Sequence, residues 1–126
     1  MKMEPSVNVL GTPLMSCSHD PKTGWFRDGC CNTDGNDIGS HTVCARVTRE
    51  FLEYLRGRGN DLMTSRPQLG FVGLKDGDQW CVCAASWRQA YLAGKACPVV
   101  LESTHSKALE IIRLEELVEM AIAAEA

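Results

Sequence analysis

Apolar positions after residue 48 predict an amphipathic helix. Phe51, Leu52 and Leu55 recur at helical spacing and form one apolar face. Thr48 precedes them and is typical of a helix N-cap, whereas Gly59 follows them and is typical of a helix end. We therefore expect a helix over residues 48–58.

A second amphipathic pattern lies near the C-terminus. Apolar residues there occupy the i, i+3, i+4, i+7 and i+8 positions, which share one helical face. The pattern predicts a helix over residues 114–125. We expect this helix to dock on the rest of the protein through Leu117, Val118, Ala121 and Ile122.

Short apolar runs between polar turns predict strands. The expected strands cover residues 7–10, 79–84, 99–101 and 111–112. A helix over residues 85–93 should follow the second strand. Because helices and strands are mixed without strict alternation, the pattern favours an α+β fold, a compact two-layer α/β sandwich.

The region over residues 11–47 is predominantly loop. It is rich in glycine, aspartate, asparagine and serine, and pairs such as Asp28-Gly29 and Asp34-Gly35 are typical of turns. A loop of this length in a compact protein is usually functional, or is held by cross-links or a metal. We expect segment 11–40 to be ordered by its cysteines, within a single domain over residues 1–126.

Composition narrows the classes of function. Apolar and charged residues make up 44% and 23% of the chain, as in ordinary globular proteins. No apolar run approaches the roughly 18 residues of a membrane helix, and residues 1–10 lack the apolar stretch of a signal peptide. The net charge is −3 without a basic stripe, which argues against nucleic-acid binding. We expect a cytoplasmic protein with reduced thiols and no membrane partner.

Cysteine is the most informative residue type, with 7 in 126 residues. The odd count favours free thiols over a disulfide framework. On a strand, Cys81 and Cys83 would place both sulfurs on one face. We expect at least two cysteines from different segments to lie together in space. The candidate thiol or metal cluster comprises Cys17, Cys30, Cys31, Cys44, Cys81, Cys83 and His41.

Three interpretations of the cysteines remain open. Several thiolates with a histidine suit a soft metal, and zinc is the candidate cofactor, although no Cys-x-x-Cys knuckle occurs. One cysteine is instead a nucleophile or redox thiol beside a cation. In the third interpretation, reduced cysteines fill the core of a non-catalytic structural or protein-interaction module. The sequence by itself does not assign a catalytic residue or a substrate.

Two further groups of polar residues are weaker candidates. Thr104 and His105 lie at an expected helix N-terminus, where free backbone N–H groups suit an anion or another ligand. Aspartates of the long loop could bind a hard cation, but their spacing does not match a calcium loop, and we interpret them as turn residues. These aspartates are Asp20, Asp28, Asp34 and Asp37.

Several longer motifs carry a resemblance to a known family. They read NVLG at 8–11, RDGCC at 27–31, GSHTVCA at 39–45, RGNDL at 58–62, GDQWCVCA at 77–84 and LESTH at 101–105. Together they resemble the bacterial family catalogued as domain of unknown function 2237, over nearly the whole chain. The resemblance implies a compact bacterial-type domain, again a two-layer α/β sandwich, without an established activity.

The resemblance also bears on individual residues. The family pattern includes the six cysteines of the candidate cluster and both His41 and His105, whereas Cys97 stands where the family has a different small residue. Gln79 and Ser86 stand where the family usually has arginines, which speaks against a positive charge beside Cys81 and Cys83. The resemblance thus leaves thiol-dependent metal binding, redox chemistry and a structural module as the candidate functions.

Overall fold

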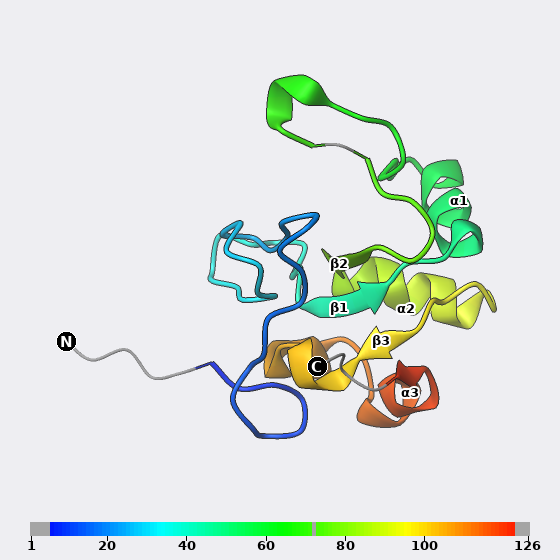
Figure 1. Ribbon diagram of the computed structural model, residues 1–126. Helices are drawn as coiled ribbons and strands as arrows, with labels where there is room; N and C mark the ends of the chain where they lie inside the picture. Colours follow the sequence, from blue (N-terminus) through cyan, green and yellow to red (C-terminus); the bar gives the residue numbers. More distant parts are fainter. Residues whose placement is uncertain (1–5, 72, 123–126) are drawn as a thin grey trace.

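The computed structural model describes residues 6–71 and 73–122. Four strands form one sheet in this part of the chain (Figure 1): β1 (Val43–Arg46), β2 (Gln79–Val82), β3 (Val99–Val100) and β4 (Ala121–Ile122). The helices are α1 (Arg49–Gly57), α2 (Ala84–Leu92) and α3 (Leu114–Glu119), with the short 3-10 helices η1 (Pro67–Leu69), η2 (Leu101–Ser103) and η3 (Ser106–Glu110). The expected α+β class is confirmed.

The sheet is mixed, with the strand order β2-β1-β3-β4. The inner strand β1 pairs in antiparallel fashion with both β2 and β3, whereas β3 and β4 are parallel. A parallel pair needs a crossover connection, and η2, η3 and α3 supply it. Among the described helices, none has the length and apolar character needed to cross a membrane.

Helix α1 forms where the sequence predicts it. The Thr48 hydroxyl accepts a hydrogen bond from the backbone N–H of Phe51 at 3.2 Å and caps the first turn. Phe51, Leu52 and Leu55 are buried, as their spacing indicates. Gly59 follows the helix with a φ of 92°, a left-handed conformation that glycine adopts without strain.

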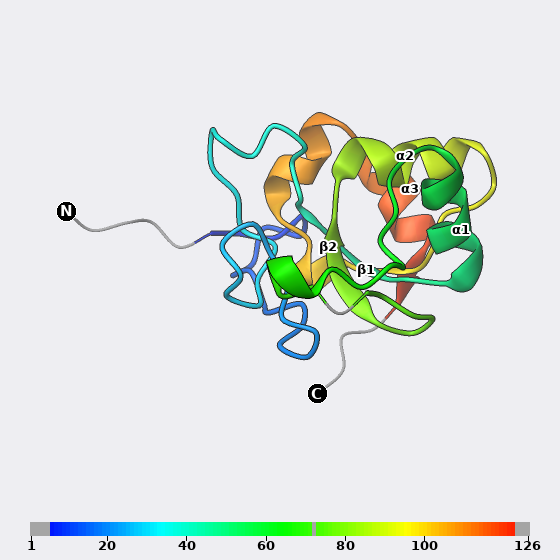
Figure 2. The same ribbon diagram turned by 90° about the horizontal axis from the view of Figure 1, so that it is seen from above.

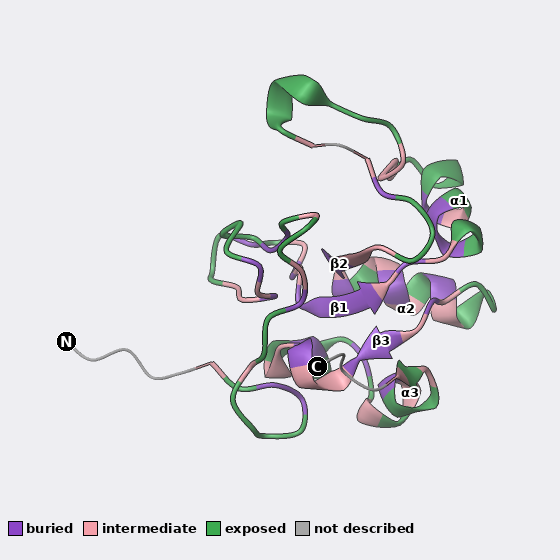
Figure 3. Cartoon of the chain, in the orientation of Figure 1, coloured by how far each residue is buried: buried purple, intermediate pink, exposed green. Residues whose placement is uncertain are grey.

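Strands β1 and β2 separate two buried clusters. Successive residues of a strand point to opposite faces of a sheet. In β1, Val43 and Ala45 join the main hydrophobic core, to which α1, α2 and α3 contribute, whereas Cys44 belongs to a second buried cluster. In β2, Cys81 alone joins this second cluster. The buried colouring of β1 in Figure 3 reflects this double coverage.

The long N-terminal loop covers the second face. Residues 6–42 contain isolated bridges but no helix or extended strand, and the blue and cyan loop lies across the sheet from α1 and α2 (Figure 2). Within the loop, the backbone N–H of Cys17 donates to the carbonyl of Gly29 at 2.7 Å. The expected long loop is therefore present, and its protection from amide exchange stays a prediction.

Two expected strands are absent from the described residues. At 7–10, the Asn8 side chain accepts hydrogen bonds from two backbone N–H groups, including that of Thr12 at 3.1 Å, and so turns the chain. At 111–112, both backbone N–H groups donate to the carbonyl of Ala108 and close η3. Local hydrogen bonds close the turn at 111–112, whereas at 7–10 the chain keeps only isolated bridges, including one between Asn8 and His105.

The C-terminal helix is shorter than its apolar pattern predicts. α3 ends at Glu119, after which Ala121 and Ile122 pair with β3. Leu117 is fully buried as expected, but Val118 is 52% exposed and Ala121 is exposed. The expected docking is thus wrong for Val118 and Ala121, because pairing with β3 takes the chain out of the helical path. Ile122 does pack against the second buried cluster, but from β4 and not from a helix. Residues 123–126 lie outside the described residues.

Leu117→Ala should lower the free energy of unfolding by about 2–5 kcal/mol, because it removes a side chain that is fully buried in the main core. Val118→Ala is the matched control on the same helix and should change it by less than about 0.5 kcal/mol. Urea denaturation of both variants measures the difference. Equal effects of the two substitutions would contradict the placement of α3.

Candidate functional site

Four cysteines meet on the face of the sheet that the helices leave uncovered. Cys44 of β1 and Cys81 of β2 are directly opposite residues of the antiparallel pair. Directly opposite side chains lie on one face with Cβ atoms about 4.5–5.5 Å apart. The strand register therefore brings these two sulfurs together, although the residues are far apart in sequence.

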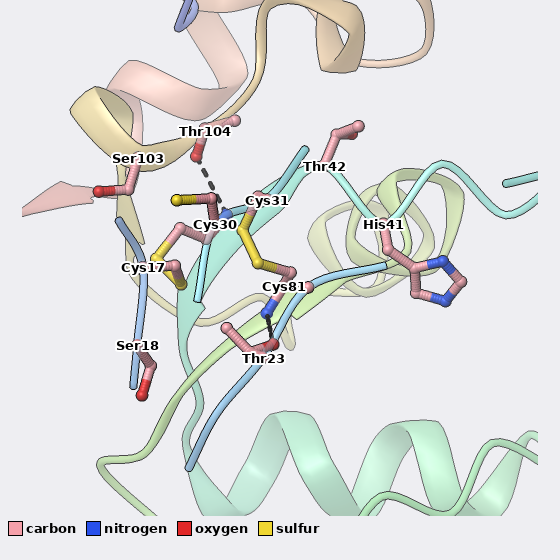
Figure 4. Close-up of a disulfide and its surroundings, with 12 residues drawn as sticks. Cys17, Ser18, Thr23, Cys30, Cys31, His41, Thr42, Cys81, Ser103 and Thr104 are labelled. Atoms are coloured by element: carbon pink, nitrogen blue, oxygen red, sulfur yellow. Dashed lines mark hydrogen bonds between the residues drawn. A yellow bond between two sulfur atoms is a disulfide. The ribbon is translucent and has the colours of Figure 1, made fainter. Parts of the chain in front are cut away.

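The two strand cysteines bond to loop cysteines and not to each other. The disulfides are Cys17–Cys44 and Cys31–Cys81, and the sulfurs of Cys17, Cys31 and Cys81 all lie within 4.8 Å of one another. All four residues are buried, with at most 6% of their surface exposed. Figure 4 shows the Cys31–Cys81 bond beside Cys17. We refer to these four cysteines as the sulfur cluster.

Threonine hydroxyls position the backbone of the sulfur cluster. The N–H of Cys81 donates to Thr23 Oγ1 at 2.9 Å, and the N–H of Cys44 donates to Thr104 Oγ1 at 3.1 Å (Figure 4). Thr23 belongs to the long loop, whereas Thr104 follows η2. The side-chain amide of Gln79 also donates to the carbonyl of Cys17 at 2.6 Å. Hydrogen bonds and covalent bonds thus fasten the same segments together.

The structure settles part of the sequence interpretation. The expectation that cysteines from different segments lie together is confirmed by Cys31–Cys81. The expectation of reduced thiols is wrong for the sulfur cluster, because the loop folds back and brings two cysteines to bonding distance of the strand pair. Of the described cysteines, Cys30, Cys83 and Cys97 remain free.

Cys83 does not share a face with Cys81. Strand β2 ends at Val82, and Cys83 is the N-cap of α2. The chain therefore turns between the two cysteines, and the prediction that a continuous strand aligns their sulfurs is wrong. His41 also points away from the sulfur cluster (Figure 4).

Cys83 and His41 instead line a common cavity. The cavity has a volume of about 290 Å³, and its walls include the aromatic side chains Trp25, Phe71 and Trp80. Cys81 reaches the same wall. The cavity therefore adjoins the sulfur cluster but offers a different set of groups: a free thiol, an imidazole and aromatic surfaces.

A buried carboxylate holds His41. Asp37 Oδ1 lies 2.6 Å from the Nδ1 atom of His41, and Asp37 Oδ2 accepts the backbone N–H of His41 at 2.9 Å. The Thr33 hydroxyl donates to the same oxygen at 2.9 Å. Burial by itself would raise the pKa of Asp37, but these hydrogen bonds and the nearby imidazole lower it below its usual value.

The sequence interpretation missed this role of Asp37. The residue was expected to shape a turn, and the backbone N–H of Ser40 does donate to its carbonyl at 3.0 Å. The carboxylate additionally binds a histidine four residues later. The missed signal was this Asp-to-His spacing inside a loop, which only a particular loop conformation converts into a contact.

The other free cysteines lie in less favourable surroundings for a nucleophile. Burial raises the pKa of Cys97 to about 12. For Cys30, burial and then the nearby Asp28 carboxylate raise the thiol pKa above its ordinary value. Both effects disfavour the reactive thiolate.

Thr104 and His105 have internal partners. Besides binding the N–H of Cys44, the Thr104 hydroxyl donates to the carbonyl of Val100 at 2.8 Å. His105 Nδ1 accepts the backbone N–H of Lys107 at 3.0 Å and caps η3, and burial lowers the pKa of this histidine. The pair supports local structure, and its use as an anion or ligand site stays a prediction.

Comparison with known protein families identifies the family of this chain. A family model described as "Uncharacterized protein conserved in bacteria (DUF2237)" matches residues 7–121. The chain belongs to this family. The resemblance inferred from the sequence motifs is therefore confirmed, and the match includes the sulfur cluster and the residues that line the cavity. No curated protein matches the chain.

Denatured protein that was purified in air should show three free thiols, those of Cys30, Cys83 and Cys97. After reduction, all 7 cysteines should react. Alkylation followed by intact-mass measurement counts them, and peptide mapping of the unreduced protein should recover the linked pairs Cys17–Cys44 and Cys31–Cys81. Seven reactive thiols before reduction would contradict the disulfides.

Asp37→Asn should destabilise the protein most above about pH 4. A carboxylate whose pKa is lower in the folded than in the unfolded state stabilises the fold when ionised, and this contribution disappears as it is protonated. The difference in free energy of unfolding between wild type and variant should therefore shrink as the pH falls from about 5 to about 3. Urea denaturation across this range measures it; a difference independent of pH would contradict the interaction.

Proposed function

We propose that the sulfur cluster is a redox-controlled site for a soft metal ion, with zinc as the ion that fits best. The observation that carries the proposal is the mutual approach of Cys17, Cys31 and Cys81 within 4.8 Å, with Cys44 joined to Cys17. The oxidised state contains two disulfides. The reduced state offers up to four thiolates to one ion.

The distances favour such a conversion. In a tetrahedral zinc–thiolate site with zinc–sulfur bonds of about 2.3 Å, neighbouring sulfurs lie roughly 3.8 Å apart. The sulfurs of Cys17, Cys31 and Cys81 lie within 4.8 Å of one another, with Cys31 and Cys81 bonded in the oxidised state. Reduction lets each bonded pair separate, and small side-chain rotations bring the four sulfurs toward a tetrahedron. Because all four residues are buried, the site would be of the closed, structural type.

The chemistry balances with a dithiol as the reductant. Two dithiol molecules donate four electrons and four protons, so that two disulfides become four thiols and each dithiol becomes a disulfide. Metal binding then displaces the thiol protons. An oxidant that re-forms the disulfides removes the thiolate ligands and releases the ion.

The proposal also accommodates the expected cytoplasmic location. Cytoplasmic thiol systems keep most cysteines reduced. There, the metal-bound form would be the resting state, and the disulfide form would arise under oxidation. The net charge of −3 supports a function that does not involve nucleic acid.

A purely structural role for the disulfides is the second candidate function. The observation that favours it is the packing of the four cysteines with Val100 into a buried cluster. Buried disulfides are poorly accessible to exchange and staple the loop to the sheet. This alternative predicts that the reduced protein gains no affinity for a metal.

Reduced protein should bind about one Co²⁺ or Zn²⁺ per chain, and Co²⁺ should show the sulfur-to-metal charge-transfer and d–d bands of a tetrahedral thiolate site. Zinc at 100 times its dissociation constant should stabilise the reduced protein by about 2.7 kcal/mol. Absorption titration and thermal melting of the metal-free and metal-bound reduced protein measure both effects.

Two cysteine variants complete this experiment. Cys81→Ser removes a cluster ligand and should abolish the tetrahedral Co²⁺ spectrum. Cys97→Ser is the matched control, because Cys97 is equally buried but belongs to the main hydrophobic core. Absence of metal binding by the reduced wild type, or an undiminished spectrum in Cys81→Ser, would refute the metal site and leave the structural role.

A further inference from the structure

The cavity beside the sulfur cluster holds a second set of reactive groups. Cys83 and His41 line it together. Cys83 is a free thiol and is not one of the four bonded cysteines. We propose that Cys83 is a nucleophile and His41 its general base, in a site that transfers the acyl group of a small activated ester or thioester. The inference does not depend on metal binding by the sulfur cluster.

The histidine is held in the orientation that a general base needs. An ionised carboxylate only accepts hydrogen bonds, so His41 Nδ1 donates its hydrogen to Asp37 across 2.6 Å. In the neutral imidazole, the Nε2 atom then carries the lone pair. The Asp37 side chain is 0% exposed, whereas 41% of the His41 side chain is exposed. The buried partner therefore fixes the ring, and the ring itself remains accessible.

Two neighbours complete the setting of the imidazole. The ring of Trp25 stacks on that of His41, with 6.2 Å between centroids and 13° between planes. Gly39 lies beside both the thiol and the ring: an added Cβ there would stand 3.0 Å from His41 Cε1 and 3.6 Å from Cys83 Sγ. The missing side chain at Gly39 lets both groups border the same space.

Cys83 has a suitable position for a nucleophile. It is the N-cap of the nine-residue helix α2, and its side chain makes no capping hydrogen bond. The backbone around it is fixed, because the N–H of Ala84 donates to the carbonyl of Ser40 at 3.0 Å and the N–H of Trp87 to that of Cys83 at 3.0 Å. The positive end of the helix dipole stabilises negative charge on the sulfur.

The cavity walls indicate the class of substrate. Trp25, Phe71 and Trp80 offer aromatic surfaces, and Arg27 lies over the Trp80 ring at 5.2 Å. Arg66 also lines the cavity. A volume of about 290 Å³ suits a small molecule with a planar apolar part, and the two cations suit an electron-rich or anionic substituent.

The reaction proceeds in two balanced steps. Cys83 sulfur attacks the acyl carbon, His41 takes the thiol proton, and the bond from the acyl carbon to the leaving alcohol or thiol breaks as His41 returns that proton to it. This leaves a thioester on Cys83. Water, deprotonated by His41, then attacks the thioester, and the Cys83 thiol and a carboxylic acid are released. Asp37 acts as a positioning residue throughout.

Incubation with p-nitrophenyl acetate tests the proposal in the intact protein. Release of p-nitrophenol measures acylation, and peptide mass mapping identifies the acetylated cysteine. Cys30 serves as an internal reference, because it is also a half-buried free thiol. We expect Cys83 to be acetylated at least tenfold faster than Cys30, with continued turnover after the first equivalent. Cys30→Ser should leave turnover unchanged.

Variants of the base separate catalysis from folding. His41→Ala should slow acetylation of Cys83 by about 100-fold, the lower end of general-base contributions, without slowing that of Cys30. Free imidazole should restore part of the rate. Asp37→Asn and Gly39→Ala should each slow Cys83 selectively, the first by loosening the ring and the second by wedging a methyl group between ring and thiol. Unfolding would instead accelerate both cysteines together.

Three results would overturn the proposal. The first is acetylation of Cys83 no faster than that of Cys30 in the wild type. The second is an unchanged Cys83-to-Cys30 ratio in His41→Ala and in the more conservative His41→Gln. The third is a stable acetyl group on Cys83 without turnover, which would show a reactive thiol that lacks the hydrolytic step.

Discussion

The alternation of side chains along β1 and β2 is the constraint on which the rest of the structure depends. One face of these strands carries the main core with the helices, and the other carries Cys44 and Cys81. A loop without helices or extended strands covers this second face. The chain-entropy model assigns about 3–4 kcal/mol to each disulfide that closes loops of the present size, with sequence separations of 27 and 50. The disulfides therefore hold this loop against the sheet, because the loop lacks the regular backbone hydrogen bonds of a helix or strand.

The same bonds position the cavity. Asp37 and His41 lie between Cys31, which is bonded to β2, and Cys44, which is itself part of β1. The segment that carries the histidine is thus fastened to adjacent strands at both ends. Asp37 then accepts hydrogen bonds from within this segment and fixes the ring locally. Two kinds of interaction therefore hold His41 in place: the disulfide of Cys31 and the hydrogen bonds to Asp37.

The sulfur cluster and the cavity are close but chemically distinct. Cys81 is bonded within the sulfur cluster and also borders the cavity, whereas Cys83 lines the cavity as a free thiol, although a single residue separates them. Because β2 ends at Val82 and α2 starts at Ala84, Cys81 bonds to a loop cysteine whereas Cys83 lines the cavity together with His41. A disulfide-bonded cysteine and a free cysteine thereby lie two positions apart in the chain.

Local sequence signals were sufficient for part of the fold. Thr48 with its following apolar residues specifies α1, and the mixture of helical and strand patterns specifies the α+β class, because capping and side-chain periodicity act within a few residues. The grouping of cysteines from distant segments was also predictable from their placement in a long loop and beside a buried strand. The family pattern pointed to the same residues.

Tertiary structure alone decided the pairing of the cysteines, the separation of Cys83 from Cys81, and the contact between Asp37 and His41. It also ended α3 at Glu119, where pairing with β3 outweighs the helical pattern. Each of these features depends on strand register or on the path of a loop. Register and loop path are set by contacts between residues far apart in the chain, and no local periodicity encodes them.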